Sequence, residues 1–524
     1  MSATRRQFLR TMAGTASLSL ANLTSLRELV VRGADEAPAA PDVIRFGPDI
    51  EPIVRLIEET PRARCVAALV EELRRGLPYR RFLSAVFFAA IRRRDSFHEV
   101  YKIHSAYQVS LDLPPEERLL PLFWAVDGIK RMHEDFPDAP NSTLKELKGP
   151  FPSSETAAAE LDDAMQRGDR DRVERALVAL ARGQGARQVM EQLWTHGAGN
   201  VSANGHRAIA VASCWRTLET IGWKHAEPVL RFVAHNLFAF GGAQPDAYYQ
   251  PNVARVDREL DKLPAGWAGG PAGRAATLEL FGLLREGKSN EACELAIRQL
   301  LAGIAAPALW DAIHLATAEM MIRGNTGYIL YSRPIHANTS ANALHYAFRT
   351  STSSRTRLLV LLQAVAWAAY ITGGDLRDKN LRDIQITQLA GGPLPASSAD
   401  AVAEIFALVP LRTYTWNVET KQAETKYGDR ADADEAGRRA FALAHDRPEA
   451  VPLFAQVARN WLCRKATVDA HEYKFLAAIL EDVEWVSAEW QPHLLAASVH
   501  FFHGKQSPDS PVIEQAREAL QKLG

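Results

Sequence analysis

Two stretches of the chain decide its fold class: DDAMQRGDRDRVERALVALARG at residues 162–183 and FGLLREGKSNEACELAIRQLLAG at residues 281–303. In each, apolar residues recur three and four positions apart on both sides of a glycine, Gly168 or Gly287. That spacing is typical of two amphipathic helices joined by a short turn. Most of the remaining chain has the same spacing, with Ala, Leu, Glu and Arg at the other positions. The sequence therefore predicts an all-α fold.

Alternation of apolar and polar residues, the pattern of a half-buried strand, is scarce in this chain. Residues 411–418 (LRTYTWNV) show it most clearly, and residues 384–389 show it more weakly. We therefore expect minor β-structure at most.

Segments rich in Gly, Pro or charged residues divide the helical sequence into four blocks. These segments cover residues 135–155, 241–273, 373–400 and 419–439. The blocks between them cover residues 47–133, 155–240, 272–370 and 436–503. Although 524 residues would suffice for about three or four domain-sized units, we expect one all-helical repeat domain over residues 41–524.

The four blocks share one order of features: an apolar helix, a histidine and a second apolar helix. The first helix is counted from Phe82, Val189, Leu309 and Phe454, and the histidines are His98, His206, His336 and His471. The separations are 16, 17, 27 and 17 residues, and the third is longer because about ten extra residues occur in 324–334. The second apolar helix follows 22 to 24 residues after each histidine. This spacing predicts degenerate helical repeats in a closed or solenoid-like array, although the 15 histidines of the chain also allow a chance match.

Equivalent histidines in four repeats would occupy equivalent surfaces. If the repeats close around an axis, the four imidazoles meet and form a metal site, because neutral imidazole is the commonest metal ligand. A nitrogen-rich site suits a transition-metal ion. We favour iron, with copper, zinc, nickel or manganese as alternatives. In an open solenoid the histidines would lie too far apart for one ion, and each would form a hydrogen bond at its own helix or act in catalysis without a metal.

Residues near these histidines extend the predicted site. Tyr107, Trp215 and His345 each lie nine positions after a repeat histidine, and we expect them to line the same cavity. Tyr107 and His345 are candidate catalytic residues, and Trp215 is a candidate cofactor contact. His225 and Glu227 precede a proline that can open a helix. They are also catalytic candidates: Glu227 either orients an imidazole or favours the helix N-terminus.

Several motif-based functions are excluded. His471 and Glu472 do not begin an HExxH motif, because Phe475 occupies the last position. The chain has no Walker A loop, no GxGxxG after a strand and no GxSxG motif, so no nucleotide-binding or esterase motif is present. The four cysteines lie far apart without a CxxC pair, which argues against a disulfide scaffold or a zinc ribbon. His445 and His503 stand in polar context, and we expect them at the surface.

Charge and hydropathy restrict the partners. Lys plus Arg number 61 and Asp plus Glu number 62, which gives a formal net charge of −1. Proteins that bind nucleic acids usually carry a basic excess, so we expect no nucleic-acid partner. We find no run after the first 30 residues that is both long and apolar enough to span a bilayer. A small-molecule substrate is the partner that we expect.

The N-terminal sequence resembles an export signal. Arg5 and Arg6 are followed by Phe8-Leu9 and by the weakly apolar residues 11–23. This pattern is similar to a twin-arginine (Tat) signal, and we expect residues 1–40 to be such a signal and a linker. Cleavage would follow Ala21 or fall within residues 37–39. The resemblance implies passage through the Tat translocase and residence in the periplasm; the alternative is a basic start of a cytosolic protein.

Three phrases carry a family resemblance. They are NGHRAIAVASCWRTLETIGWKHAEPVLRF at 204–232, IHANTSANALHYAF at 335–348 and DAHEYKFLAAILED at 469–482. They resemble bacterial, often Tat-exported proteins of unknown function and, more distantly, the questin oxidase-like family. The resemblance implies an all-helical oxygenase or oxidoreductase. The matching histidine positions are His206, His225, His336, His345 and His471.

Together these patterns predict an exported, metal-dependent oxidoreductase or oxygenase that acts on a small organic molecule, with an aromatic compound as one possibility. The first alternative is a non-catalytic helical scaffold or binding protein of the cell envelope. The second is a metal-dependent hydrolase or lyase in which Glu227 or Glu472 is the base.

Overall fold

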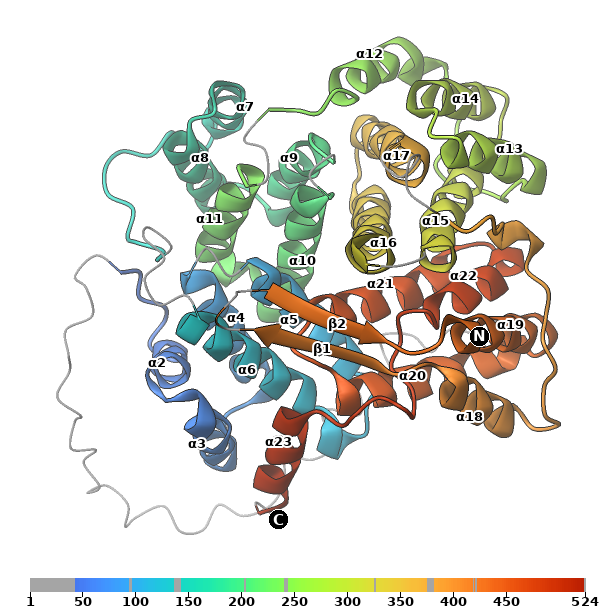
Figure 1. Cartoon of the computed structure of the whole chain (residues 1–524). Coiled ribbons are helices and arrows are strands. Elements are labelled where there is room, and N and C mark those ends of the chain that lie inside the picture. Colours follow the sequence, from blue (N-terminus) through green and yellow to red (C-terminus); the bar gives the residue numbers. More distant parts are fainter. Residues whose placement is uncertain are drawn as a thin grey trace, which may run out of the picture. The chain divides into compact units, whose positions relative to one another are not determined.

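The computed structural model describes residues 43–93, 97–135, 143–201, 204–239, 244–324, 327–374, 381–417, 419 and 422–522. Helices dominate this part of the chain (Figure 1), and its two strands form one small sheet. The prediction of an all-α fold with minor β-structure is therefore confirmed. The predicted export signal lies outside the described residues.

The helices follow one another in groups that correspond to the blocks of the sequence, except that Ser398–Leu408 of the fourth group precedes its block. The first group contains α2 (Glu51–Glu59), α3 (Arg62–Arg74), α4 (Tyr79–Arg92), α5 (Phe97–Ser110) and α6 (Leu120–Asp135). The second contains α7 (Ala157–Arg167), α8 (Arg170–Gly183), α9 (Ala186–Ala198), α10 (His206–Ile221) and α11 (Ala226–Leu237). Helix α12 (Tyr249–Glu259) lies in the segment between the second and third blocks.

The third and fourth groups, like the first two, each contain five helices among the described residues. The third contains α13 (Arg274–Arg285), α14 (Ser289–Leu301), α15 (Ala306–Arg323), α16 (Gly327–Thr350) and α17 (Ser354–Ala369). The fourth contains α18 (Ser398–Leu408), α19 (Arg430–Asp446), α20 (Val451–Lys465), α21 (His471–Trp485) and α22 (Gln491–Ser498). Helix α23 (Pro511–Gln521) follows and packs against α3 and α6 of the first group. Short 3₁₀ turns occupy Pro115–Glu117, Trp223–His225, Leu260–Lys262, Ile386–Gln388, Pro448–Ala450 and Ala488–Trp490, and a π turn occupies Tyr370–Gly374.

Four helices, one from each group, form the centre of the fold. Helix α5 packs against α10 and α21, and α16 packs against the same two helices (Figure 1). Each of the four also packs against the helix before it and the helix after it in its own group. We call α5, α10, α16 and α21 the central helices. The prediction of four degenerate repeats goes beyond these contacts and stays a prediction.

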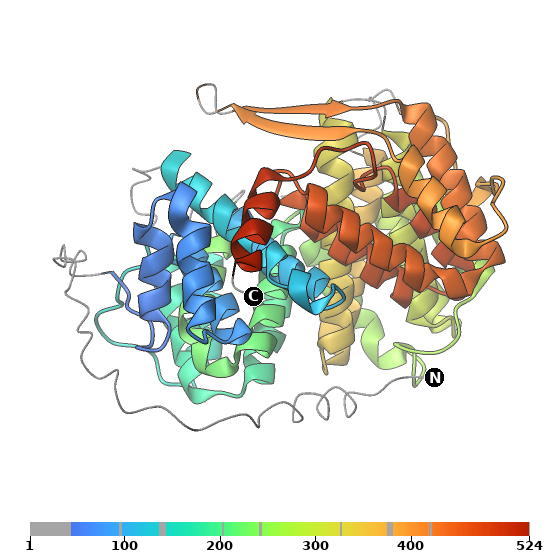
Figure 2. The same cartoon turned by 90° about the horizontal axis from the view of Figure 1, so that it is seen from below.

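The two strands form a hairpin that reaches out from the C-terminal helices (Figure 2). Strand β1 (Arg412–Asn417) pairs antiparallel with β2 (Gln422–Tyr427), with Arg412 opposite Tyr427. The expectation of a strand within 411–418 is confirmed. The weaker expectation for residues 384–389 is wrong, because Ile386–Gln388 forms a 3₁₀ turn there. The buried amide of Ile386 donates to the Glu319 carboxylate at 2.9 Å instead of to a neighbouring strand.

One helix corrects the sequence-based statement about membrane spans. By length and composition, Ser354–Gly373 is apolar enough to cross a bilayer. However, 89% of its most apolar window is buried inside the protein, as in a core helix of a globular domain.

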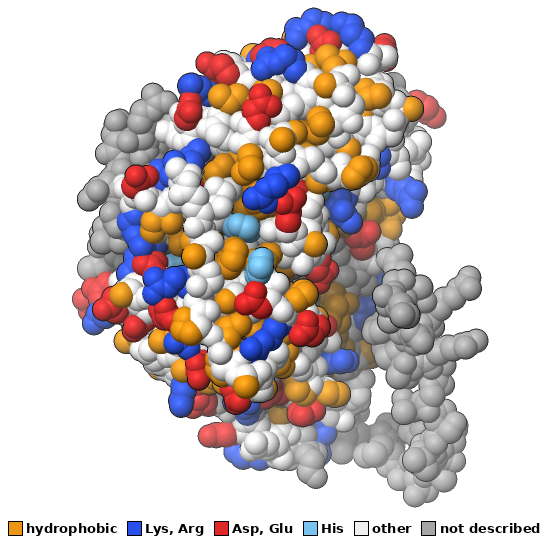
Figure 3. Space-filling model, turned by 90° about the vertical axis from the view of Figure 1, so that its right-hand side faces the viewer, with side chains coloured by type: hydrophobic (Ala, Val, Ile, Leu, Met, Phe, Trp, Pro, Cys, Tyr) orange, Lys and Arg blue, Asp and Glu red, His pale blue; other side chains and the backbone are white. Residues whose placement is uncertain are grey.

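On the face that Figure 3 shows, acidic and basic side chains are interspersed, in agreement with the near-zero net charge.

Close packing of α10 on α16 depends on one glycine. Gly205 immediately precedes α10 with φ = 67°, in the left-handed region. A Cβ atom at this position would overlap the Cβ of Ser340 on α16. The Ser340 hydroxyl in turn accepts a hydrogen bond from the Trp367 indole at 2.6 Å, which fixes the serine in place. The glycine therefore sets the distance between two central helices.

We expect Gly205→Ala to destabilise the protein by about 2–5 kcal/mol in denaturant unfolding. The left-handed backbone costs roughly 1–2 kcal/mol for a residue with a Cβ, and the overlap with Ser340 adds about 1–3 kcal/mol. Gly168→Ala is the matched control, because Gly168 also has a positive φ of 71° but no atom within 4 Å of a Cβ placed there. If the two variants lost the same free energy of unfolding, the contact between α10 and α16 at Gly205 would not contribute to the loss.

Candidate metal centre

The four repeat histidines lie on the four central helices. His206 is the first residue of α10 and His471 the first of α21, and His98 is the second residue of α5. His336 lies within α16, two residues after the internal Pro334. Because the four helices pack against one another, these side chains meet, and we call them the histidine quartet. His206, His336 and His471 are buried and His98 is partly buried.

Three members of the quartet, His98, His336 and His471, are close enough for their nitrogens to share one ion, and His206 adjoins two of them. Around the quartet, neighbouring ring centroids lie 5.4 Å (His98–His206), 4.7 Å (His206–His336), 4.9 Å (His336–His471) and 4.8 Å (His471–His98) apart. His206 Nε2 lies 3.1 Å from His336 Nε2 and 3.3 Å from His98 Nε2. Ligand atoms of His98, His336 and His471 all lie within 4.8 Å of one another. The four rings therefore lie beside one another, while the closed array of repeats stays a prediction.

These separations fit a metal shell. With metal–nitrogen bonds of about 2.0–2.1 Å, neighbouring ligands lie roughly 2.8–3.4 Å apart, from octahedral to tetrahedral geometry. Distances of 3.1 and 3.3 Å also fit N–H···N hydrogen bonds. A single hydrogen on His206 Nε2 would have to be shared between two neighbours, whereas one cation attracts all the nitrogen lone pairs at once. The donor set therefore suits an ion better than a hydrogen-bonded chain.

Two members of the quartet have their tautomer set by a partner outside it. His336 Nδ1 donates to the Ser332 carbonyl at 2.7 Å. His471 Nδ1 donates to the Asp469 carboxylate at 2.7 Å. In a neutral imidazole, a hydrogen on Nδ1 leaves Nε2 with a lone pair. Both rings therefore offer Nε2 as a ligand atom, in the manner of second-sphere partners of metal-bound histidines.

Burial keeps three of the imidazoles neutral. The pKa values of His98 and His336 are held well below the usual range, mainly by desolvation and then by neighbouring positive groups. The pKa of His471 is lowered for the same first reason. Neutral imidazole is the form that binds metals. Lys474, three residues after His471, is itself so buried that its pKa falls to about 8.

Positive charge surrounds the quartet. The N-terminal ends of α5, α10 and α21 face it, and helix N-termini favour anions. The Lys474 ammonium is buried without a hydrogen-bond partner among the described residues, 5.8 Å from the Tyr101 ring centre. A cation in the quartet would therefore be held most favourably together with an anionic ligand.

A buried carboxylate supports the quartet from outside. Asp469 Oδ1 accepts from the backbone N–H of His471 at 3.0 Å as well as from its ring. Its other oxygen accepts from Arg412 Nη2 at 2.9 Å. Arg412 lies on β1, and its guanidinium also stacks 3.6 Å above the Phe501 ring. The hairpin thus supplies the cation that neutralises the carboxylate of the His471 pair.

Glu472 belongs to the same network. Its carboxylate accepts from the Thr467 N–H and hydroxyl, both at 2.8 Å, and lies 3.2 Å from Arg412. His503 Nε2 lies 3.0 Å from it. The expectation that His503 is a surface residue is wrong: it is 2% exposed because it packs against this buried carboxylate. His445 is exposed, as expected.

The other predicted site residues lie elsewhere. Nine positions along a helix correspond to two and a half turns, so such a side chain faces away from the histidine and lies about 13 Å further along. Tyr107 contacts the rings of Tyr79 and His104, and Trp215 contacts Trp223. His345 joins a different histidine, which is described below. The expected shared cavity with the quartet does not form from these residues.

His225 and Glu227 are also distant from the quartet. They follow the end of α10, whose length from His206 is about 22 Å at 1.5 Å per residue. His225 packs against Phe88, and Glu227 pairs with Arg182 at 2.8 Å. The structure therefore brings together the four predicted metal ligands and leaves the five predicted neighbours apart from them.

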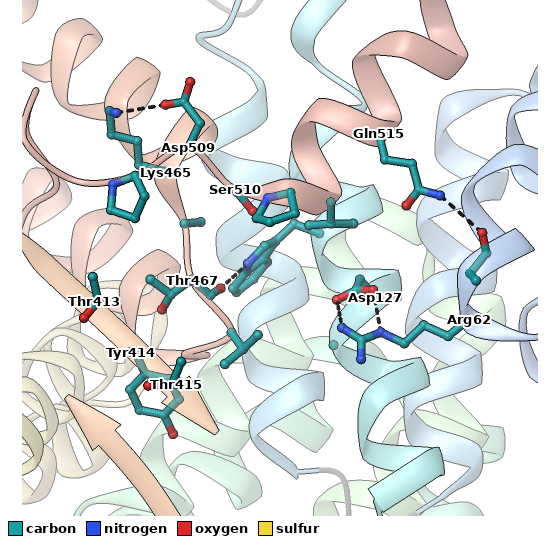
Figure 4. Close-up of a pocket in the computed structure, with 18 of the residues that line it drawn as sticks. Arg62, Asp127, Thr413, Tyr414, Thr415, Lys465, Thr467, Asp509, Ser510 and Gln515 are labelled. Carbon is teal, nitrogen blue, oxygen red and sulfur yellow. Dashed lines mark hydrogen bonds and ion pairs between the residues drawn. The ribbon is translucent and has the colours of Figure 1, made fainter. Parts of the chain in front are cut away.

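Two cavities adjoin the central helices. A small one of about 30 Å³ lies among polar side chains that include His104, Arg216 and Lys474. A larger one of about 800 Å³ lies between α3, α6, β1 and the segment before α23 (Figure 4). Lys102 and Thr467 line the larger cavity, and each lies four residues from a quartet histidine.

The charged pairs that Figure 4 shows in the larger cavity are Arg62 with Asp127 and Lys465 with Asp509, at 2.7 and 2.8 Å. Trp124 and Tyr414 add aromatic surface. A volume of this size suits a small organic molecule.

Comparison with known proteins does not assign the chain to a family. No family model matches the chain, and neither curated proteins nor solved structures give a match. The questin oxidase-like resemblance therefore stays a prediction.

We expect Arg412→Met to destabilise the protein by about 3–5 kcal/mol, because it leaves the buried carboxylates of Asp469 and Glu472 without their cation. Chemical denaturation measures the loss. Arg74→Met is the control, since Arg74 pairs with Glu71 at the surface, and we expect it to unfold at the wild-type denaturant concentration. Equal stability of Arg412→Met and the wild type would contradict the assigned role of Arg412.

Proposed function

We propose that the histidine quartet binds one transition-metal ion and that the protein is a metal-dependent oxidoreductase acting on a small organic molecule. The observation that carries the metal proposal is the convergence of Nε2 atoms at 3.1 and 3.3 Å on His206. The quartet joins helices from all four groups, so an ion there would also stabilise the centre of the fold.

The number of imidazoles favours iron over zinc for a catalytic role. Four protein ligands complete a tetrahedral zinc shell, as in structural sites, whereas catalytic zinc keeps one position open. A six-coordinate ion held by four imidazoles has two positions left. Iron in such a site would supply one-electron chemistry, and imidazole suits it.

The surrounding residues have separate tasks in this proposal. Asp469 and the Ser332 carbonyl hold two imidazoles with Nε2 directed inward. The Lys474 ammonium, which has no hydrogen-bond partner among the described residues, would attract an anionic ligand of the ion. The small cavity has a volume of about 30 Å³. Because a water needs at least about 10–15 Å³, this volume has room for water only. The larger cavity offers the space for an organic substrate.

The hydrolase or lyase alternative has less support. Glu472 is engaged by Thr467, Arg412 and His503, so its carboxylate is not available as a base. Glu227 pairs with Arg182 at the other end of α10. The scaffold alternative differs from the proposal in needing no metal. Export by the Tat translocase to the periplasm is proposed from Arg5-Arg6 and the residues after them.

The first test is elemental analysis of the full chain purified without a metal-affinity tag. We expect about one equivalent of a transition metal in the wild type and a loss of at least tenfold in His206→Ala and His336→Ala. His493→Ala is the control, because His493 is also buried but lies on α22 outside the quartet. Circular dichroism checks that each variant keeps its helices.

A metal-free wild type, or unchanged metal in both quartet variants, would remove the basis of the proposal. The identity of the ion tests the reaction class. Iron or copper gives an absorption band or paramagnetic signal that responds to ascorbate. A spectroscopically silent zinc protein would instead indicate a structural site and contradict the oxidoreductase proposal.

We expect Asp469→Asn to weaken metal binding about 10–100-fold. The uncharged amide oxygen is a weaker acceptor for His471 Nδ1 than the carboxylate, so it holds the His471 ring less firmly. Competition with a chelator measures the affinity. Asp311→Asn is the control: Asp311 is equally buried, but it accepts from Ser487 and not from the quartet. Affinity equal to that of the wild type in Asp469→Asn would show that this carboxylate does not support the ligand.

A further inference from the structure

A second pair of buried histidines lies away from the quartet, on α15 and α16. His345 Nδ1 lies 2.8 Å from His314 Nε2. His314 Nδ1 lies 3.4 Å from a carboxylate oxygen of Asp482 on α21. The three side chains are 5%, 1% and 0% exposed, so no bulk water competes for these contacts.

The nearby carboxylate favours one tautomer of His314. Asp482 Oδ1 accepts from Asn342 at 2.8 Å, and Oδ2 lies 3.4 Å from His314 Nδ1 without forming a hydrogen bond to it. A hydrogen on His314 Nδ1 is favoured electrostatically by this carboxylate, and His314 Nε2 then accepts from His345 Nδ1. His345 is left with a lone pair on Nε2. Burial, His314 and Arg349 hold the pKa of His345 well below its usual value, so the ring is a neutral hydrogen-bond acceptor.

His345 lines an open cavity of about 490 Å³ whose walls are largely aromatic. Trp310 stacks on the imidazole at 4.2 Å with an angle of 4°, and Trp485 meets it edge-on at 4.8 Å. Phe348 also lines the cavity and contacts Trp310 at 5.5 Å. Flat aromatic walls around an acceptor favour a planar ring as the ligand.

The same cavity carries positive charge that no carboxylate neutralises among the described residues. Arg349 lies 4.8 Å above the Trp485 ring, and Arg357 lies 5.9 Å above Phe348 and donates to the Ser351 carbonyl at 2.8 Å. The Trp310 indole N–H, on a side chain only 2% exposed, is buried without an acceptor in this part of the chain. Two guanidinium groups and an unused donor suit a carboxylate.

We propose that this cavity is a binding site for a hydroxylated aromatic carboxylate. The ring packs against Trp310 and Trp485, the carboxylate pairs with Arg349 and Arg357, and the hydroxyl donates to His345 Nε2. Asp482 and His314 act as positioning residues that keep His345 in the accepting tautomer. The site is separate from the quartet and does not require a metal.

The test uses 4-hydroxybenzoate as the probe, with binding to the full chain followed by calorimetry and tryptophan fluorescence. We expect saturable binding, and about tenfold weaker binding of benzoate, which lacks the hydroxyl, and of phenol, which lacks the carboxylate. His345→Phe keeps the stacked ring but loses the acceptor, so it should bind 4-hydroxybenzoate and benzoate equally. Arg438→Gln, an exposed arginine on α19, is the control and should bind like the wild type.

The double variant Arg349→Gln/Arg357→Gln tests the carboxylate contact without touching the buried histidines. It should bind the probe at least tenfold more weakly and lose the preference over phenol. No saturation by 4-hydroxybenzoate up to millimolar concentration, or wild-type preferences in both variants, would overturn the proposal. Metal content measured in the same variants should equal that of the wild type, so the outcome here is independent of the quartet.

Discussion

The mutual packing of α5, α10, α16 and α21 is the constraint on which the candidate site depends. Three of the quartet histidines stand at the first or second residue of their helices, so the position of each imidazole follows from the position of a helix end. Gly205 permits one of these close approaches, where α10 meets Ser340 of α16. A shift of one turn, about 5.4 Å, in any of the four helices would remove its nitrogen from the cluster.

Electrostatics make this arrangement costly without compensation. Three helix N-termini and Lys474 give a positive environment around the imidazoles, and burial of Asp469 and Glu472 requires a cation close by. Arg412 provides that cation for both carboxylates, at 2.9 and 3.2 Å. Removal of one partner of such a buried network costs more than the network contributes as a whole. Strand β1, which carries Arg412, therefore supports the quartet, although it lies outside the helices that form the rest of the site.

The sequence alone predicted the helical fold, because the spacing of apolar residues along a helix is local information. It predicted that the four histidines meet only if the repeats close around an axis, and it left an open solenoid as the alternative. Arg412 could not be found in this way, since its contact with Asp469 joins segments that only the tertiary fold brings together. The neighbours chosen nine positions after each histidine failed for a geometric reason: two and a half turns place them on the opposite face. His345 nevertheless marked a second cluster, whose partners His314 and Asp482 lie on other helices and left no sequence pattern.

The two proposed sites share α16 and α21, which carry His336 and His471 at one end and His345 and Asp482 further along. Between them, Arg216 and Asn342 bind the Glu481 carboxylate at 2.6 and 2.9 Å, which holds α10, α16 and α21 together. Charges about 13 Å apart interact by about 1 kcal/mol at an effective dielectric constant of about 20. A cation in the quartet would thus strengthen binding of an anion beside His345 only about fivefold. Larger coupling between the sites would have to come from movement of the shared helices, and the Glu481 contacts resist such movement.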